Sequence, residues 1–121
     1  GVTDVITLAA YVGETEEEVL GAATDPDCAA ALTENNISLL KSGAIGGLNG
    51  LLAGLAPRYG LRGICLLATT SGSEPVDVAA AGRLLAAIKE LLNLDLDLTV
   101  LSPFGEEQEI EAPSEIDMNY R

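Results

Sequence analysis

The sequence contains no histidine, the side chain that most often acts as a general base, a proton shuttle or a metal ligand. Catalysis by a Ser-His-Asp triad, by a Cys-His pair or by a histidine-bound metal is therefore excluded within this chain. The two cysteines, Cys28 and Cys65, lie in apolar stretches, where a free cysteine behaves as a small hydrophobic residue. We predict that both are reduced core residues, and we expect no metal site, no cofactor and no catalytic residues.

Positively charged residues are also scarce. Six Lys and Arg stand against nineteen Asp and Glu, which gives a net charge of −13. Such a chain repels the phosphates of nucleic acids and of anionic lipid headgroups, so we expect no nucleic acid and no membrane as a partner. Two interpretations of this charge remain open: an ordinary acidic surface, or the surface of a protein kept soluble in a cytoplasm of high salt concentration.

Aromatic residues are few, with no Trp, one Phe and three Tyr. Hydrophobic residues still make up 48% of the 121 residues, so we expect a core of Leu, Ile, Val and Ala in a single domain or a piece of one. No apolar stretch reaches the roughly 18 residues that a membrane span needs, and the N-terminus does not resemble a targeting signal. We therefore expect a cytoplasmic protein.

The spacing of apolar residues predicts strands that alternate with helices. Strands are predicted over residues 2–10, 19–23 and 62–68 and from residue 37 onward, and helices over residues 26–34, 48–59 and 76–92. Residues 94–98 fit either an edge strand or a short helical return. The alternation predicts an α/β layer structure over residues 1–102, and the abrupt change after Pro103 predicts an acidic tail over residues 103–121.

Two stretches are candidates for binding an anion or a small ligand. A glycine-rich turn opens the helix predicted from Leu48, and a hydroxyl-rich loop follows the apolar strand predicted over residues 62–68, where open α/β sheets usually bind ligands. The candidate residues are Gly43, Gly46, Gly47, Asn49, Gly50, Thr69, Thr70, Ser71 and Asp77. Tight packing of the glycines and helix capping by Asp77 are the alternatives, and the glycine spacing matches no nucleotide-binding fingerprint.

The C-terminus carries a different kind of candidate site. Met118, Asn119, Tyr120 and Arg121 place one aromatic ring beside the terminal carboxylate, after an acidic segment. An end with a ring, a carboxylate and an Arg suits capture in a partner's pocket that contains a basic residue. The alternative is that Tyr120 is simply an exposed terminal residue.

Several ordered motifs resemble those of a known family. The stretch from GAIGGLNGLL through RGICLLA and DVAAA to LDLDL, together with VTDVITLAA and VLGAATD, is similar to the second half of archaeal members of the proteasome assembly chaperone family. The resemblance covers roughly residues 2–101. Members of this family are about twice as long, so we expect either a piece of a longer protein or a short relative that completes its sheet through a partner chain.

The resemblance implies a three-layer α/β/α fold with a mainly parallel sheet, similar to nucleoside phosphorylases but without their catalytic groups. It also implies self-association, and docking of a C-terminal hydrophobic-Tyr-any motif between the α subunits of the proteasome. Tyr120 and Arg121 match the last two positions of that motif, whereas Asn119 stands where a hydrophobic residue is expected. The chain is thus expected to be a non-enzymatic proteasome chaperone or adaptor; the alternatives are a phosphorylase-like enzyme that binds nucleotides or small molecules, and an oligomerisation module of unknown partner.

Overall fold

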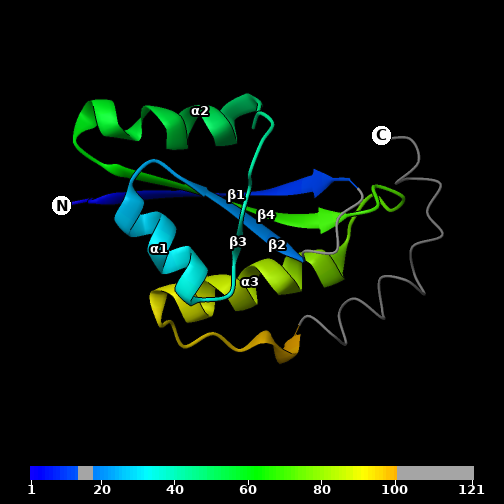
Figure 1. The fold of residues 1–121 in the computed structure, drawn as a ribbon. Coiled ribbons are helices and arrows are strands. Elements are labelled where there is room, and N and C mark those ends of the chain that lie inside the picture. The colour runs from blue at the N-terminus through cyan, green and yellow to red at the C-terminus, as the bar shows by residue number, and fades with distance from the viewer. Residues whose placement is uncertain (14–17, 101–121) are drawn as a thin grey trace.

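The computed structural model describes residues 1–13 and 18–100, which form a four-stranded sheet with helices against it (Figure 1). The strands are β1 (Asp4–Val12), β2 (Val19–Ala23), β3 (Ser38–Leu39) and β4 (Arg62–Thr70). The α-helices are α1 (Pro26–Glu34), α2 (Gly47–Leu55) and α3 (Val78–Leu92), and the 3₁₀ helices are η1 (Ala56–Tyr59) and η2 (Leu98–Val100). The predicted order of strands and helices is confirmed.

The sheet has the strand order β1-β4-β2-β3 and is mixed. β4 pairs with β1 in parallel and β2 pairs with β3 in parallel, but β2 and β4 are antiparallel. Two of the three pairings are parallel, in agreement with the expectation of a mainly parallel sheet, and the central pairing of β2 with β4 is the exception. The reason is the path of α2, which runs back along the sheet so that the chain enters β4 at the end opposite to the start of β2 (Figure 1).

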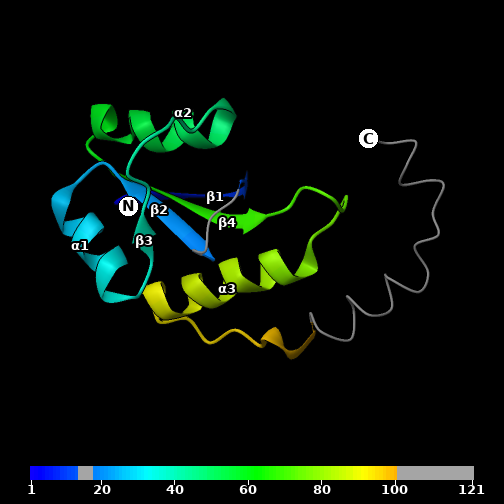
Figure 2. The same ribbon diagram turned by 45° about the vertical axis from the view of Figure 1, so that its right-hand side comes forward.

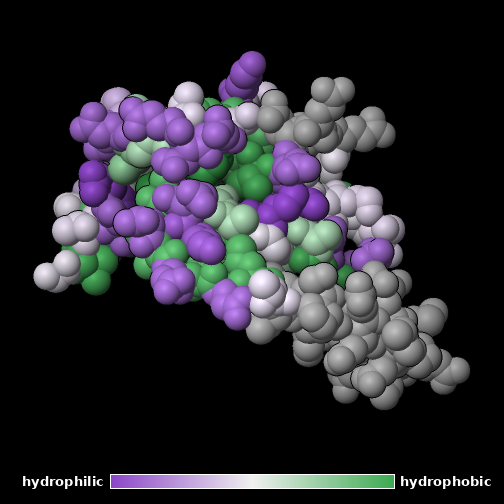
Figure 3. Space-filling view, turned by 90° about the horizontal axis from the view of Figure 1, so that it is seen from below, coloured by the Kyte–Doolittle hydropathy of each residue, from purple (hydrophilic) through white to green (hydrophobic). Residues whose placement is uncertain are grey.

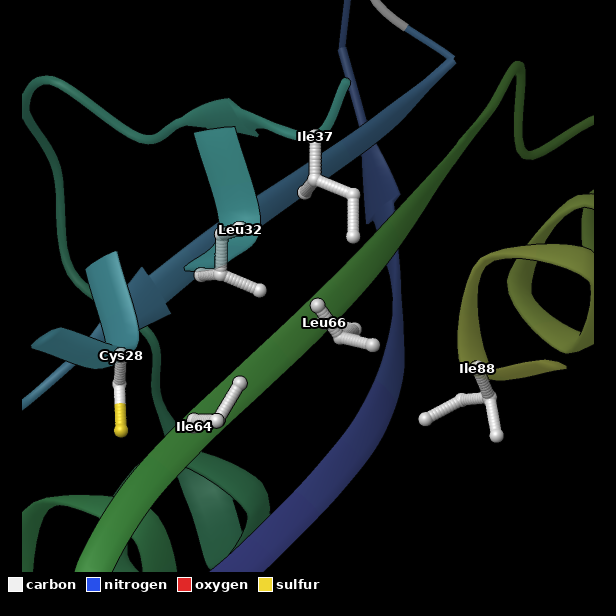
Figure 4. Packing of buried hydrophobic residues seen from close by; sticks show 6 residues of the cluster. All are labelled: Cys28, Leu32, Ile37, Ile64, Leu66 and Ile88. Carbon is white, nitrogen blue, oxygen red and sulfur yellow. The ribbon is translucent and has the colours of Figure 1, made fainter. Parts of the chain in front are cut away.

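Helices lie on both faces of the sheet. On one face, α1 and α3 cover a cluster that includes Ile64 and Leu66 of β4, and Figure 4 shows Leu32 of α1 and Ile88 of α3 on that side. On the other face, α2 contributes Ala53 to a second cluster with Cys65 and Leu67 of β4. The two clusters use alternate residues of β4, because successive side chains of a strand point to opposite faces.

β4 is buried along most of its length, as its unbroken apolar run predicts. All six residues from Gly63 to Ala68 are buried, since the strand has neighbours on both sides and helices on both faces. Cys28 and Cys65 are both free and buried, and they belong to different clusters. The prediction that they are reduced core residues is confirmed.

Local signals in the sequence set where two of the helical segments begin and end. One carboxylate oxygen of Asp25, Oδ1, accepts hydrogen bonds from the backbone N–H groups of Asp27 (2.7 Å) and Cys28 (3.2 Å), which caps α1. Pro57 lies in η1, where the helix tightens after α2, and Gly60 ends it in the left-handed conformation with φ 74°.

Two local expectations need revision. The strand expected from residue 37 contains only the two residues of β3, and residues 94–97 form no strand, so the helical alternative for this segment holds at η2. The acidic tail predicted over residues 103–121 lies outside the described residues.

Candidate functional site

The two candidate ligand-binding stretches lie toward the same end of the sheet. In Figures 1 and 2, the start of α2 and the loop after β4 are both near the carboxyl ends of β1 and β4. The topology therefore places the glycine-rich turn and the hydroxyl-rich loop toward the same end of the sheet, where α/β sheets usually bind ligands. The local contacts of each stretch determine what chemistry this end can perform.

The glycines of the turn have conformational and steric roles. Gly43 (φ 110°) and Gly47 (φ 69°) adopt backbone conformations that other residues rarely reach, and Gly46 caps α2 without a side-chain hydrogen bond. A Cβ atom at Gly50 would lie 1.9 Å from the carbonyl oxygen of Ile45, so only glycine fits there. The backbone carbonyl of Asn49 accepts a hydrogen bond from the Thr7 hydroxyl.

Two residues help to position α2 on the sheet, and the sequence analysis predicted neither role. A Cβ atom at Gly63 of β4 would lie 1.9 Å from the carbonyl oxygen of Ala53, so this glycine lets α2 approach the sheet closely. The hydroxyl of Thr7, a buried residue in β1, donates to the carbonyl of Asn49 at 3.0 Å and ties the first turn of α2 to the sheet. The place of Gly63 at the start of an apolar strand was a signal in the sequence that a helix could approach the strand closely there. The sequence around Thr7 carries no comparable signal for its hydrogen bond to Asn49.

The hydroxyls at the end of β4 and in the loop after it are engaged in hydrogen bonds within the chain. Both the N–H and the Oγ1 of Thr69 donate to the carbonyl of Glu18, at 3.1 and 3.3 Å. The Thr70 hydroxyl donates to Oδ2 of Asp77 at 2.6 Å, and the hydroxyls of Ser71 and Ser73 lie 2.7 Å apart. None of these hydroxyls lies beside a histidine of this chain, because the sequence has none, so the imidazole that most often activates such nucleophiles is missing.

Asp77 caps α3, which was the structural alternative for this residue. Its Oδ1 accepts a hydrogen bond from the backbone N–H of Ala80 at 2.9 Å. The Thr70 hydroxyl, followed by the Ala80 N–H, holds the pKa of the Asp77 carboxyl below its usual range. A carboxylate stabilised in its charged form is a poor general base, so its geometry fits a structural cap better than proton transfer.

Arg83 joins α3 to the end of β4 and was not singled out in the sequence. Its Nη2 donates to the backbone carbonyl of Thr69 at 2.8 Å, and its charge contributes to the lowered pKa of Asp77. The guanidinium therefore supports the same loop that Asp77 and Thr70 hold together. In the sequence, Arg83 is one of the charged residues of an amphipathic helix, a position typical of a charge on the surface. Its position therefore predicts no contact with Thr69.

The remaining expected sites fall outside these contacts. Within the described ranges, no group of three or more His, Cys, Asp or Glu side chains is placed to hold a metal ion. None of the helices described here is both long and apolar enough to cross a membrane. Met118, Asn119, Tyr120 and Arg121 lie outside the described residues.

The apolar stripe of α2 and η1 faces away from the sheet, although such a stripe ordinarily packs on the core. Its members and their exposed fractions are Leu48 (67%), Leu51 (57%), Leu52 (47%), Leu55 (39%) and Tyr59 (78%). We call these five residues the α2 outer face. The small residue Ala53 is the buried residue of α2 and faces the sheet instead. On the opposite side of the molecule, which carries α3, hydrophilic residues cover much of the surface (Figure 3).

Comparisons with known proteins place this geometry among relatives of known structure. The PAC2 family matches residues 1–114. PbaA of Pyrococcus furiosus, an archaeal homologue of proteasome-assembly chaperone, superposes with a TM-score of 0.81 at 28% identity, over 90% of this chain and 47% of PbaA. PbaB of the same organism, an archaeal proteasome activator, superposes with a TM-score of 0.73 at 30% identity, over 89% of this chain and 48% of PbaB.

A proteasome-assembly chaperone homologue of Mycobacterium tuberculosis shares the fold, with a TM-score of 0.67 at 21% identity over 98% of this chain and 54% of the homologue. The comparison with curated protein sequences finds no match. The chain spans about half the length of each of these relatives of known structure.

Proposed function

Because the chain belongs to the PAC2 family, we propose that it acts as a non-enzymatic partner of the proteasome in the cytoplasm, either as an assembly chaperone or as an adaptor. The observation that carries this proposal is the likeness to PbaA and PbaB, whose described roles both concern the proteasome. A fold alone does not determine a function, so the proposal also needs support from the contacts at the sheet end.

The contacts at the sheet end support a non-enzymatic role. The Thr69 hydroxyl donates to the carbonyl of Glu18, next to β2, and Asp77 accepts from the Thr70 hydroxyl and the Ala80 N–H. A catalytic site needs groups whose hydrogen bonds and pKa values are adjusted for proton transfer or attack. Here the hydrogen bonds and the lowered pKa of Asp77 instead stabilise the start of α3.

For the mode of binding, we propose that the C-terminal tail presents Tyr120 and the terminal carboxylate to a pocket between proteasome α subunits. Several tails in one self-associated particle would bind a ring of repeated pockets together, so each single contact can be weak. The body over residues 1–102 would then serve as the scaffold, with the three-layer, phosphorylase-like arrangement that the family resemblance implies.

Capture of proteasome α subunits from the source cytosol at its native salt concentration tests this mode. The variants to compare are the intact chain, a chain that ends at Asn119, and Tyr120→Ala. Leu92→Ala is the control on the body, because it removes a side chain that is 43% exposed on α3, away from the α2 outer face. We expect capture by the intact chain and by Leu92→Ala, and loss of capture in both tail variants.

The other outcomes of this experiment each reject part of the proposal. Equal capture by all forms would move the interface from the tail to the body. Capture by none of them would remove the support for a proteasome partner and leave the ligand-binding alternative.

A second candidate function is the binding of a phosphate-containing or nucleoside ligand. The specific observation that favours it is the position of the glycine-rich turn and of the loop over residues 69–77 toward one end of the sheet (Figure 2). A ligand that binds only the folded chain raises its melting temperature. Millimolar inorganic phosphate and a nucleoside should therefore raise the melting temperature if this function is correct, and an unchanged value with both probes would reject it.

A further inference from the structure

We propose that the α2 outer face binds the same face of a second copy of this chain. The proposal deepens the self-association that the proposed function requires and names the surface responsible for it. Its starting observation is that Leu48, Leu51, Leu52, Leu55 and Tyr59 project from one helical segment and are 39% to 78% exposed. An apolar stripe of this kind, left uncovered, favours association in water.

Charge selects a second copy as the occupant. Two copies of a chain with a net charge of −13 repel each other over most of their surfaces. Residues 43–57 contain no charged side chain, and the nearest charged residues on either side, Lys41 and Arg58, are positive. The α2 outer face is thus a region where an identical acidic chain approaches with little like-charge repulsion, whereas a strongly basic partner would be drawn to the acidic surfaces instead.

Gly54 provides an independent observation. It lies inside α2, has an ordinary helical φ, is exposed, and a Cβ atom built on it would meet no other atom within 4 Å. Glycine in a helix interior is unfavourable relative to alanine, and nothing within the described fold requires it here. Because Gly54 is three residues after Leu51, the two lie side by side on the helix, and the missing side chain leaves room for the backbone of a second helix.

A two-fold pairing accounts for the pattern of the stripe. In an isologous contact, residue i of one copy meets residue j of the other and the reverse also holds. With two α2 helices antiparallel, Leu51 and Leu52 meet near the two-fold axis, and Leu48 of each copy packs toward Leu55 of the other. Because the α2 outer face is built from five residues of one short helical segment, we expect a weak interface with a dissociation constant on the order of micromolar.

Sedimentation velocity over a concentration series tests the proposal with two matched variants. Leu52→Glu places a charge on the α2 outer face, and Leu92→Glu places the same charge on a leucine of α3 with nearly the same exposure, 43% against 47%. We expect Leu52→Glu to raise the dissociation constant about tenfold or more and Leu92→Glu to leave it within about twofold.

A third variant separates association from folding. Gly54→Ala fills the space that the missing side chain leaves on the α2 outer face. We expect a higher melting temperature for the monomer together with weaker association, and general damage to the fold does not produce this combination. The intact chain should also associate more strongly when salt screens its negative charge.

The outcomes test separately whether the chain self-associates and whether it does so through the α2 outer face. An oligomer that persists unchanged in both Leu52→Glu and Gly54→Ala overturns the α2 surface but leaves self-association in place. An intact chain that stays monomeric at high concentration and high salt overturns both, and would mean that another partner covers the α2 outer face. Neither result depends on the capture of proteasome subunits, so that part of the proposed function stands or fails separately.

Discussion

α2 and α3 pack on opposite faces of the same strand, yet they use opposite kinds of side chain to do so. α3 buries Ile88 and partly buries Leu84 and Leu91 against the sheet. α2 buries only Ala53, and its leucines point to solvent. α3 is held by the burial of large apolar side chains, whereas α2 is held by the close approach of backbones at Gly63 and by the hydrogen bond from Thr7.

The difference shows that a helical apolar stripe does not by itself say which way a helix faces. The stripe of α2 has the same spacing as that of α3, but the small residues between its leucines make the tighter contact with the sheet. A helix packed through small residues keeps its large apolar residues available for another surface. The following predictions test this contrast through the stability of the monomer.

The largest expected effect separates the two helices directly. Ile88→Ala removes a buried side chain of α3 and leaves a cavity, so we expect a loss of about 3 kcal/mol in the free energy of unfolding. Leu52→Ala removes an exposed side chain of α2 and should change this free energy by less than about 0.5 kcal/mol. Urea denaturation at low protein concentration measures both. Equal losses would mean that α2 is anchored by its leucines after all.

A second substitution tests the close approach of α2 to the sheet. A Cβ atom at position 63 would lie 1.9 Å from the Ala53 carbonyl oxygen, so Gly63→Ala must push α2 away from β4. We expect a loss of about 2 kcal/mol in the same denaturation experiment, typical of overpacking. A stability within about 0.5 kcal/mol of the wild-type value would show that the contact is not needed to hold α2.

The start of α3 gives a third prediction, which includes a dependence on pH. Asp77→Ala removes the cap of α3 and the partner of Thr70, so we expect a loss of about 1 kcal/mol at neutral pH.

The pKa of the Asp77 carboxyl is lowered in the folded state. Its stabilisation is therefore complete above the ordinary aspartate pKa and is lost as the pH falls through the lower folded-state pKa. Asp77→Asn keeps a capping oxygen but cannot titrate. Its loss relative to the wild type should therefore shrink below about pH 4, and a difference that stays constant with pH would contradict this assignment.

The smallest expected effect is a gain in stability. Gly54→Ala adds a methyl group that meets no other atom within the described fold, so the better helix former should raise the free energy of unfolding by about 0.8 kcal/mol. Gly54→Ala and Gly63→Ala form a matched pair. Both add one methyl group, the first on the exposed side of α2 and the second between α2 and β4, and we expect them to change the free energy of unfolding in opposite directions. A loss of stability at position 54 would show that the exposed side of α2 is constrained within the monomer.

The sequence predicted local structure well where a local signal acts alone. Asp25-Pro26 begins α1, Gly60 ends η1, and the apolar run of β4 is buried on both faces. The antiparallel pairing of β2 with β4 was not predicted, because strand direction depends on how α2 crosses the sheet. Among the candidate site residues, Asp77 could be recognised as a helix cap, but the links from Arg83 to Thr69 and from Thr7 to Asn49 connect segments that are 14 and 42 residues apart.

The sequence by itself determined which residue types are available for chemistry and the family to which the chain belongs, because residue types and motif order are local properties. The chain has no histidine for the common catalytic pairs, and the PAC2 family matches residues 1–114. Only the tertiary structure decided that α2 turns its leucines outward, because that depends on how closely Ala53 of α2 packs against Gly63 of β4. Side-chain spacing fixes which residues share a helix face, and only packing fixes what that face meets.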